Sequence, residues 1–217
     1  MKSHSTFLDY VMPYVPGATV ELATLEIKKT CIEFCEKSLI IQRDHDPVTV
    51  ITNTGDYDFE PPITNHLVTK VMKMWFKDAE MGAVNPDSIT DPTIYNTGYE
   101  GAVVAKSTPQ FYFQKDERTF TIHPRPSATS ASAITMRVAL KPSRSAVLVE
   151  DVLLEDYAEE IGAGAIARLM MSPGKPYSSP NSGAIYQAKY VQGINAARQR
   201  AVRGYVRSDS RIQIPAL

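Results

Sequence analysis

Apolar residues near the amino terminus recur at steps of three and four, which is the spacing of one face of an α-helix. The pattern predicts a helix that begins near Thr19. A shorter helix is predicted around Ser5–Val11, because Pro13, Pro16 and Gly17 separate the two segments. The apolar positions of the longer helix are Val20, Thr24, Ile27, Cys31, Phe34 and Cys35.

The pattern changes to short apolar and alternating runs after the first helix. Strands are predicted at Leu39–Ile41, at Val48–Ile51 and at Tyr57–Phe59, and the twelve residues His66–Lys77 fit a strand better than a helix. Residues 78–108 contain many glycines and prolines, which favours a long exposed loop with one helical turn near Pro86–Asp91.

A hairpin signal follows, with strands over 110–114 and 118–122 joined by a polar turn. A third strand is predicted at Ile134–Leu140. The connections are too short to hold crossover helices, so the prediction is an antiparallel meander.

Helical periodicity returns in the last third of the chain. One helix is predicted from Val152 to Leu169, ending before Ser172–Gly174, and another from Ala184 to about Tyr205. The apolar positions of the last helix are Ile185, Ala188, Val191, Ile194, Ala201 and Val202.

The order of helices, then strands, then helices predicts an α+β fold. We expect residues 1–38 and 143–205 to form a helical subdomain and residues 39–142 a β subdomain with its long loop at 78–108. The β subdomain is predicted to be an antiparallel sandwich or a small barrel. Residues 206–217 have the composition of an extended carboxy-terminal tail.

Composition and charge narrow the function classes. The 217 residues are 43% hydrophobic and carry a formal net charge of -1, so the chain has a core but no global field that draws it to nucleic acid or to a membrane. Two cysteines cannot form a disulfide framework, so reduced, buried thiols at Cys31 and Cys35 are expected. We also expect no signal peptide and no membrane span.

Candidate catalytic groups are few. The four histidines are dispersed, and no glycine-flanked serine or cysteine marks a nucleophile, which favours a protein that is not an enzyme. Asp44, His45 and Asp46 could hold a divalent metal, but their place before Pro47 between two strand runs is more typical of a turn. No cofactor is expected.

Charge is strongly segregated in the two last helices. Residues 150–160 contain six acidic side chains and no basic one, and much of this charge suits a helix amino terminus. Residues 183–217 contain six basic side chains and one acidic side chain, a local net charge of +5. A solvated helix face and an interaction surface are both consistent with this pattern.

Two glycines, Gly162 and Gly164, lie inside the predicted helix at 152–169. Each costs about 0.5–1 kcal/mol relative to alanine at such a position. The sequence therefore predicts close packing of another segment against this face, from the same chain or from a neighbouring one.

Several segments together resemble the head-to-tail adaptor, or connector, proteins of tailed bacteriophages. The segments are CIEFCEKS, the YDFEPP strand end, the PQFYF and RTFTIHP hairpin, EDYAEEIGAGAIARLM, PGKPYSSP and INAARQRA. The likeness concerns the layout of nearly the whole chain and not a short catalytic signature.

The resemblance implies a structural virion protein that forms a ring, typically of twelve copies, and joins the capsid portal to the tail. It further implies assembly in the host cytoplasm, contact with tail or nozzle proteins through the loops between Ala79 and Ser107, and transient non-specific contact with DNA in the lumen. Mapped onto this sequence, the portal and subunit interface comprises Arg198, Arg203, Tyr205, Arg207, Ile212, Ile214 and Leu217, with Glu155 and Glu159 as acidic partners.

Two other classes stay open at this point. A β-rich virion binding or decoration module would use the hairpin and the 79–107 loop as its binding surface. A metal-dependent hydrolase built on Asp44, His45 and Asp46 is the third possibility.

Overall fold

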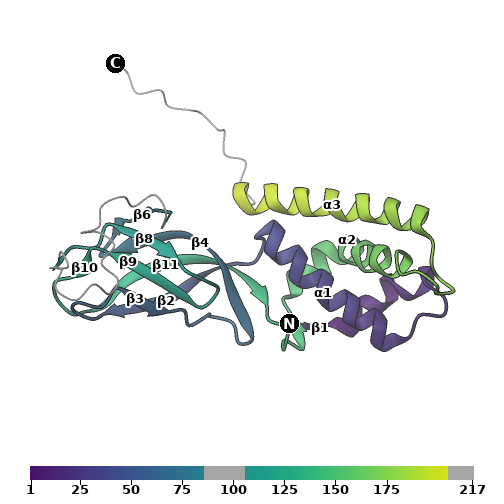
Figure 1. The fold of residues 1–217 in the computed structure, drawn as a ribbon, viewed down its shortest axis with the longest axis horizontal. Helices are drawn as coiled ribbons and strands as arrows, with labels where there is room; N and C mark the ends of the chain where they lie inside the picture. The colour runs from purple at the N-terminus through teal and green to yellow at the C-terminus, as the bar shows by residue number, and fades with distance from the viewer. Residues whose placement is uncertain (86–105, 205–217) are drawn as a thin grey trace, which may run out of the picture. The chain divides into compact units, whose positions relative to one another are not determined.

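The computed structural model describes residues 1–85 and 106–204. The chain divides into two compact units: Met1–Ile40 with the chain from Leu148 onward, and Ile41–Val147. Figure 1 shows the long helices in the first unit and the long strands in the second. The fold is α+β, as the order of periodicities predicts.

The helical unit contains three α-helices among the described residues, preceded by short 3-10 turns and closed by a small strand pair. Its elements are β1 (Lys2–Ser3), η1 (His4–Tyr10), η2 (Met12–Tyr14), α1 (Val20–Ser38), β12 (Leu148–Val149), α2 (Asp151–Met170) and α3 (Pro180–Arg203). The predicted helices near Ser5–Val11, Thr19 and Val152–Leu169 are confirmed, the first of them as a 3-10 helix.

The ends of α1 follow from its capping residues. The Thr19 hydroxyl accepts a hydrogen bond from the backbone N–H of Leu22 at 3.4 Å, which satisfies a donor that the first turn leaves open. Leu39 takes the left-handed conformation, with φ 56°, and its N–H donates to the carbonyl of Cys35. The predicted strand at Leu39–Ile41 is therefore wrong, because Leu39 ends the helix and the strand begins only at Gln42.

In the second half of α1, the buried residues are those that the sequence pattern predicts. Cys31, Phe34 and Cys35 are fully buried, and both cysteines are free. Burial raises the pKa of each thiol, which keeps the sulfur protonated and unreactive. Val20, by contrast, is half exposed.

The β unit holds two four-stranded sheets within the described residues, which form no closed barrel. In one sheet the order is β2 (Gln42–Val50), β11 (Ser130–Pro142), β4 (His66–Phe76) and β5 (Ala79–Glu80). In the other it is β3 (Asp56–Asp58), β9 (Thr119–His123), β8 (Phe111–Gln114) and β6 (Gly82–Ala83). A further pair joins β7 (Lys106–Ser107) to β10 (Arg125–Pro126).

The predicted hairpin and the predicted strand at His66–Lys77 are confirmed as β8–β9 and β4. The predicted meander is wrong, because β11 pairs with β2 and β4 in the other sheet and not with β9. The long strand β11 finds partners of matching length there, and two short strand pairs, β6–β8 and β7–β10, are parallel. The predicted helical turn at Pro86–Asp91 lies outside the described residues.

The Gln114 side chain links the two sheets. The Gln114 amide of β8 donates to the carbonyl of Val68 and accepts from the N–H of Val71, both at 3.1 Å and both on β4. The pairing of β4 with β11 is irregular beside Val68 and Val71. The backbone groups of these two residues therefore lie near the other sheet. The core of the unit lies around Phe120, Ile122 and Met74, which are at most 1% exposed.

Helix α3 begins at Pro180, four residues before the predicted start, with proline at the position where a missing N–H costs nothing. Its predicted apolar stripe is largely wrong. Ile185, Val191 and Val202 are 72%, 44% and 77% exposed. The buried positions of this helix are Gly183, Tyr190, Gly193, Ile194 and Ala197.

Candidate interaction surface

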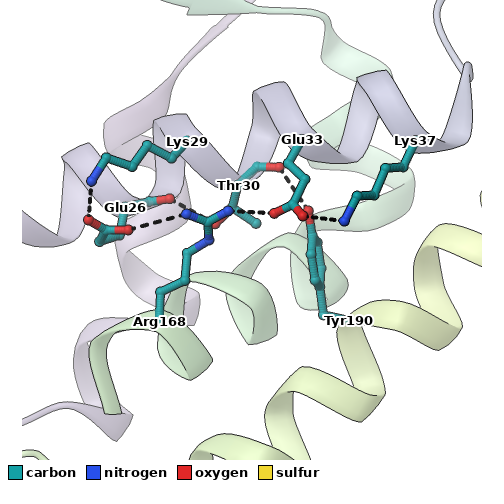
Figure 2. Close-up of polar contacts among 7 residues, drawn as sticks. All are labelled: Glu26, Lys29, Thr30, Glu33, Lys37, Arg168 and Tyr190. Carbon is teal, nitrogen blue, oxygen red and sulfur yellow. Dashed lines mark hydrogen bonds and ion pairs between the residues drawn. The ribbon is translucent and has the colours of Figure 1, made fainter. Parts of the chain in front are cut away.

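An ion-pair network joins α1 to α2 (Figure 2). The Arg168 guanidinium of α2 lies between Glu33, to which it donates a hydrogen bond, and Glu26, at 3.7 Å. Lys37 and Lys29 bind the same two carboxylates from along α1. Of these five charged side chains only Arg168 comes from α2, so its contacts with the two glutamates hold the register between the two helices.

The electrostatics of Glu33 follow from these neighbours. Partial burial opposes its ionisation, but hydrogen bonds from Lys37 and Arg168 outweigh burial, so the pKa of this carboxyl lies below its ordinary value. The folded state thus favours the ionised form.

Tyr190 anchors α3 to the other two helices. Its ring is 1% exposed, and its hydroxyl donates to the backbone carbonyl of Thr30 at 3.1 Å, as Figure 2 shows. The Phe34 ring lies 6.2 Å away, centroid to centroid. A buried hydroxyl without a partner would be costly, so this bond also sets how deeply the ring enters.

The two glycines of α2 lie where other segments of the same unit approach. A Cβ on Gly162 would lie 3.0 Å from the Tyr10 Cβ, and one on Gly164 would lie 2.6 Å from the Thr30 Cγ2. In α3, a Cβ on Gly193 would lie 2.7 Å from the Cβ of Glu160. Segments of the same chain therefore pack against the glycine face of α2.

The acidic run of α2 is largely paired within its own unit. The amino-terminal ammonium lies 2.8 Å from Asp151, Arg200 lies 3.0 Å from Asp156, and Lys189 lies 2.9 Å from Glu159. The hydrogen bond from Lys189 holds the pKa of Glu159 below its ordinary value. Lys2 lies 3.9 Å from Glu155. The side chains of Glu155 and Glu159 remain 65% and 70% exposed, so both can still contact another molecule.

The arginines near the end of α3 have a different environment. Arg198 and Arg203 are exposed, and neither forms an ion pair with any part of the chain that the structure describes. They line a shallow surface groove together with Asn195, Gln199 and Val202. The remaining residues expected in the portal interface lie outside the described residues: Tyr205, Arg207, Ile212, Ile214 and Leu217.

The structure also shows an exposed apolar feature that the sequence interpretation misplaced. Ile185 and Val202 project from α3 and are more than 70% exposed, and Val191 on the same helix is 44% exposed. Val202 lines the same groove as Arg198 and Arg203, and an exposed aliphatic side chain beside unpaired arginines is typical of surfaces that contact other proteins. Small residues at the buried positions of α3 were the signal that could have identified this face.

The Asp44–Asp46 segment differs from its prediction. It lies within the continuous strand β2 and not in a turn, and the predicted strand at Val48–Ile51 is the end of that same strand. The His45 Nδ1 lies 2.6 Å from the carbonyl of Asp46, and its Nε2 accepts from the N–H of Glu60 at 3.0 Å. Both ring nitrogens are thereby used by backbone groups. Over 1–85 and 106–204, no three His, Cys, Asp or Glu side chains gather as metal ligands would.

Within the described residues, every helix is too short or too polar to cross a lipid bilayer.

These features define a protein whose exposed helix face suits contact with other proteins. Comparison with known families matches residues 10–212 to the family described as SU10 adaptor protein. The chain belongs to this family. It is thus a phage adaptor protein, a structural component of the virion that associates with other virion proteins. No curated protein gives a match.

Proposed function

We propose that this adaptor forms a homo-oligomeric ring of twelve copies at the neck of the virion, which joins the capsid portal to the tail and surrounds the DNA channel. The family match over residues 10–212 is the observation that carries the proposal. The exposed face of α3 supports it, because a subunit that joins two larger assemblies needs unpartnered surface outside its own core.

The portal contact is assigned to the carboxy-terminal end of the chain. Arg198 and Arg203 are exposed and unpaired by the described residues, so they offer a cationic surface without breaking an internal ion pair. The sequence beyond it, residues 205–217, adds two arginines and aliphatic residues that include Ile212, Ile214 and Leu217. Tail or nozzle proteins would meet the loops between Ala79 and Ser107.

A ring requires that one face of each subunit fit a different face of the next. The arginines of α3 provide one such face, and the exposed carboxylates Glu155 and Glu159 belong to the other. Basic side chains that line the lumen would meet the DNA backbone without sequence preference, through contacts that weaken as salt rises.

The decisive experiment adds the purified full chain to portal rings of the same phage and measures the mass of the product by native mass spectrometry. We expect a defined stoichiometric addition, with the copy number read from the mass. Arg198→Glu with Arg203→Glu should abolish the addition, while Arg144→Glu, an exposed arginine of the β unit, should leave it intact. A portal that gains no mass, or gains it in random increments, contradicts the proposal.

Assembly in the host cytoplasm accords with the two free, buried thiols. Their burial protects them from oxidation in the finished particle, since a protonated and inaccessible sulfur is a poor nucleophile.

A further inference from the structure

A small groove lies at the opposite end of α3 from the unpaired arginines. It has a volume of about 240 Å³ and is formed by η1, η2, α2 and α3 of the helical unit. Typical small-molecule pockets measure about 300–1,000 Å³, so this one suits a single side chain better than a cofactor. Its lining includes three tyrosines and three charged side chains: Tyr10, Tyr14, Tyr186, Asp9, Glu159 and Lys189.

The aromatic wall of the groove is open to solvent. Tyr10 and Tyr14 are 41% and 52% exposed, and the Tyr14 and Tyr186 rings lie 5.8 Å apart, inclined at 60°. Exposed tyrosine faces carry negative electrostatic potential, which attracts a cation placed over the ring. A guanidinium is well suited to this environment because it is planar and weakly hydrated.

The charges of the groove add to this preference. Asp9 is exposed and has no hydrogen-bond or ion-pair partner among the described residues. Glu159 is neutralised by Lys189 at 2.9 Å, which leaves the Asp9 carboxylate as the unbalanced charge of the lining. A carboxylate beside aromatic faces is the arrangement that an arginine satisfies with both its charge and its plane.

The same helix carries suitable arginines, but they cannot reach the groove of their own chain. Arg198 lies twelve residues and Arg203 seventeen residues beyond Tyr186 on one continuous helix. At 1.5 Å per residue these separations are about 18 and 26 Å, farther than an arginine side chain extends. A donor at one end and an acceptor at the other end of one helix produce contacts that run from copy to copy in a single direction.

We propose that the groove of Asp9, Tyr10, Tyr14 and Tyr186 binds the α3 arginines, Arg198 or Arg203, of a neighbouring copy of this chain. The inference rests on the ring proposed above and names the acceptor site of its subunit contact. Glu159 also lines the groove, where Lys189 balances its charge.

The test uses two full-length variants that each lack one half of the contact. Asp9→Lys removes the acceptor, and Arg198→Ala with Arg203→Ala removes the donor. Self-association is measured by analytical ultracentrifugation over a concentration series at low ionic strength, where charge contacts are least screened. We expect each variant to associate at least about tenfold more weakly than the unmodified chain, which corresponds to about 1.4 kcal/mol.

A mixture of the two variants gives the sharper result. The Asp9→Lys chain retains its arginines and the other variant retains its groove, so one contact can form between them and no further one. We expect one-to-one heterodimers that do not grow with concentration. Tyr14→Phe should associate like the unmodified chain, because the aromatic face remains, whereas Tyr14→Ala should weaken association. Glu21→Lys, an exposed charge reversal on α1 outside the groove, is the matched control.

Several outcomes overturn the inference. These are an Asp9→Lys variant that associates like the unmodified chain, a mixture that gains nothing over either variant, and an unmodified chain that stays monomeric at the highest concentration. An Asp9→Lys effect that persists in the mixture would assign the groove to another occupant, such as the same chain's carboxy-terminal segment. Addition of the unmodified chain to portal rings is measured without these variants, so a ring that forms on the portal while the Asp9→Lys chain associates normally would overturn this contact and leave the proposed function standing.

Discussion

Gly164 of α2 faces the Tyr190 ring of α3 so closely that a Cβ on the glycine would lie 2.7 Å from the tyrosine Cδ2. The same added carbon would lie 2.6 Å from the Thr30 Cγ2 of α1. All three helices of the described helical unit therefore meet at one position that has no side chain. The close approach lets the Tyr190 hydroxyl reach the Thr30 carbonyl.

We expect Gly164→Ala to destabilise the protein by about 1–3 kcal/mol, because overpacking at this junction outweighs the gain in helix propensity. The measurement is the free energy of unfolding of the helical unit in urea. Gly162→Ala is the graded control, since its Cβ would meet the Tyr10 Cβ at 3.0 Å and so should cost less. Equal effects at the two positions would contradict this account of the packing.

We expect Glu33→Gln to lower stability at neutral pH and to lose its effect in acid. The folded state holds the pKa of Glu33 below its ordinary value of 4.5, so the ionised carboxylate favours folding above that pH. This contribution disappears as pH falls through the folded-state pKa. The stability difference between the two proteins, measured from pH 7 downward by chemical denaturation, should therefore shrink below about pH 4.5.

The control for this experiment is Glu21→Gln, an exposed carboxylate on the same helix. Its stability difference should stay small across the same pH range. A constant deficit for Glu33→Gln at all pH values would show that shape and hydrogen bonding, and not charge, explain the role of this residue.

The exposed apolar side chains of α3 should matter for assembly and not for folding. We expect Ile185→Ser with Val202→Ser to leave the melting temperature close to that of the unmodified protein, since both side chains are more than 70% exposed. The same variant should bind portal rings more weakly. Ile194→Ala, at a position 6% exposed on the same helix, should cost about 2–5 kcal/mol in stability. A large loss of stability in the serine variant would mean that this face packs within the chain.

Deletion of Ser208–Leu217 separates the ring adaptor from a β-rich binding module. We expect the shortened chain to keep its melting temperature, because the cores described above are built from residues 1–85 and 106–204. We expect it to lose stoichiometric addition to the portal, measured by native mass spectrometry. A binding module that uses the hairpin and its neighbouring loop would instead bind its partner unchanged.

Local patterns predicted the types of most elements in this protein. The three-to-four spacing identified α1 and α2, and alternation identified β4, although the buried positions Val68, Val71 and Met74 are spaced by three where its ladder shifts register. The capping residue Thr19 marked the start of α1 in the sequence itself. These signals depend only on residues that are close together in the sequence. They can therefore be recognised without knowing which segment packs against the helix or strand.

The candidate surface could be predicted only in part. The sequence showed the arginines Arg198 and Arg203 and the acidic run, but not that Asp156 and Glu159 have partners in their own unit. It also did not indicate Asp9 and Tyr14, because a groove brings together residues that are distant in the chain. No spacing rule connects them.

The sequence by itself determined that the chain is α+β, that its long helices lie towards the two ends, and that its last helix is basic. Only the tertiary structure decided which side of α3 is buried and which sheet receives β11. A periodic pattern indicates that a segment has an apolar side. Which side is buried depends on the shape of the segments that pack against it. On α3 close packing selected glycine and alanine around Tyr190 and left the larger Ile185 and Val202 outside.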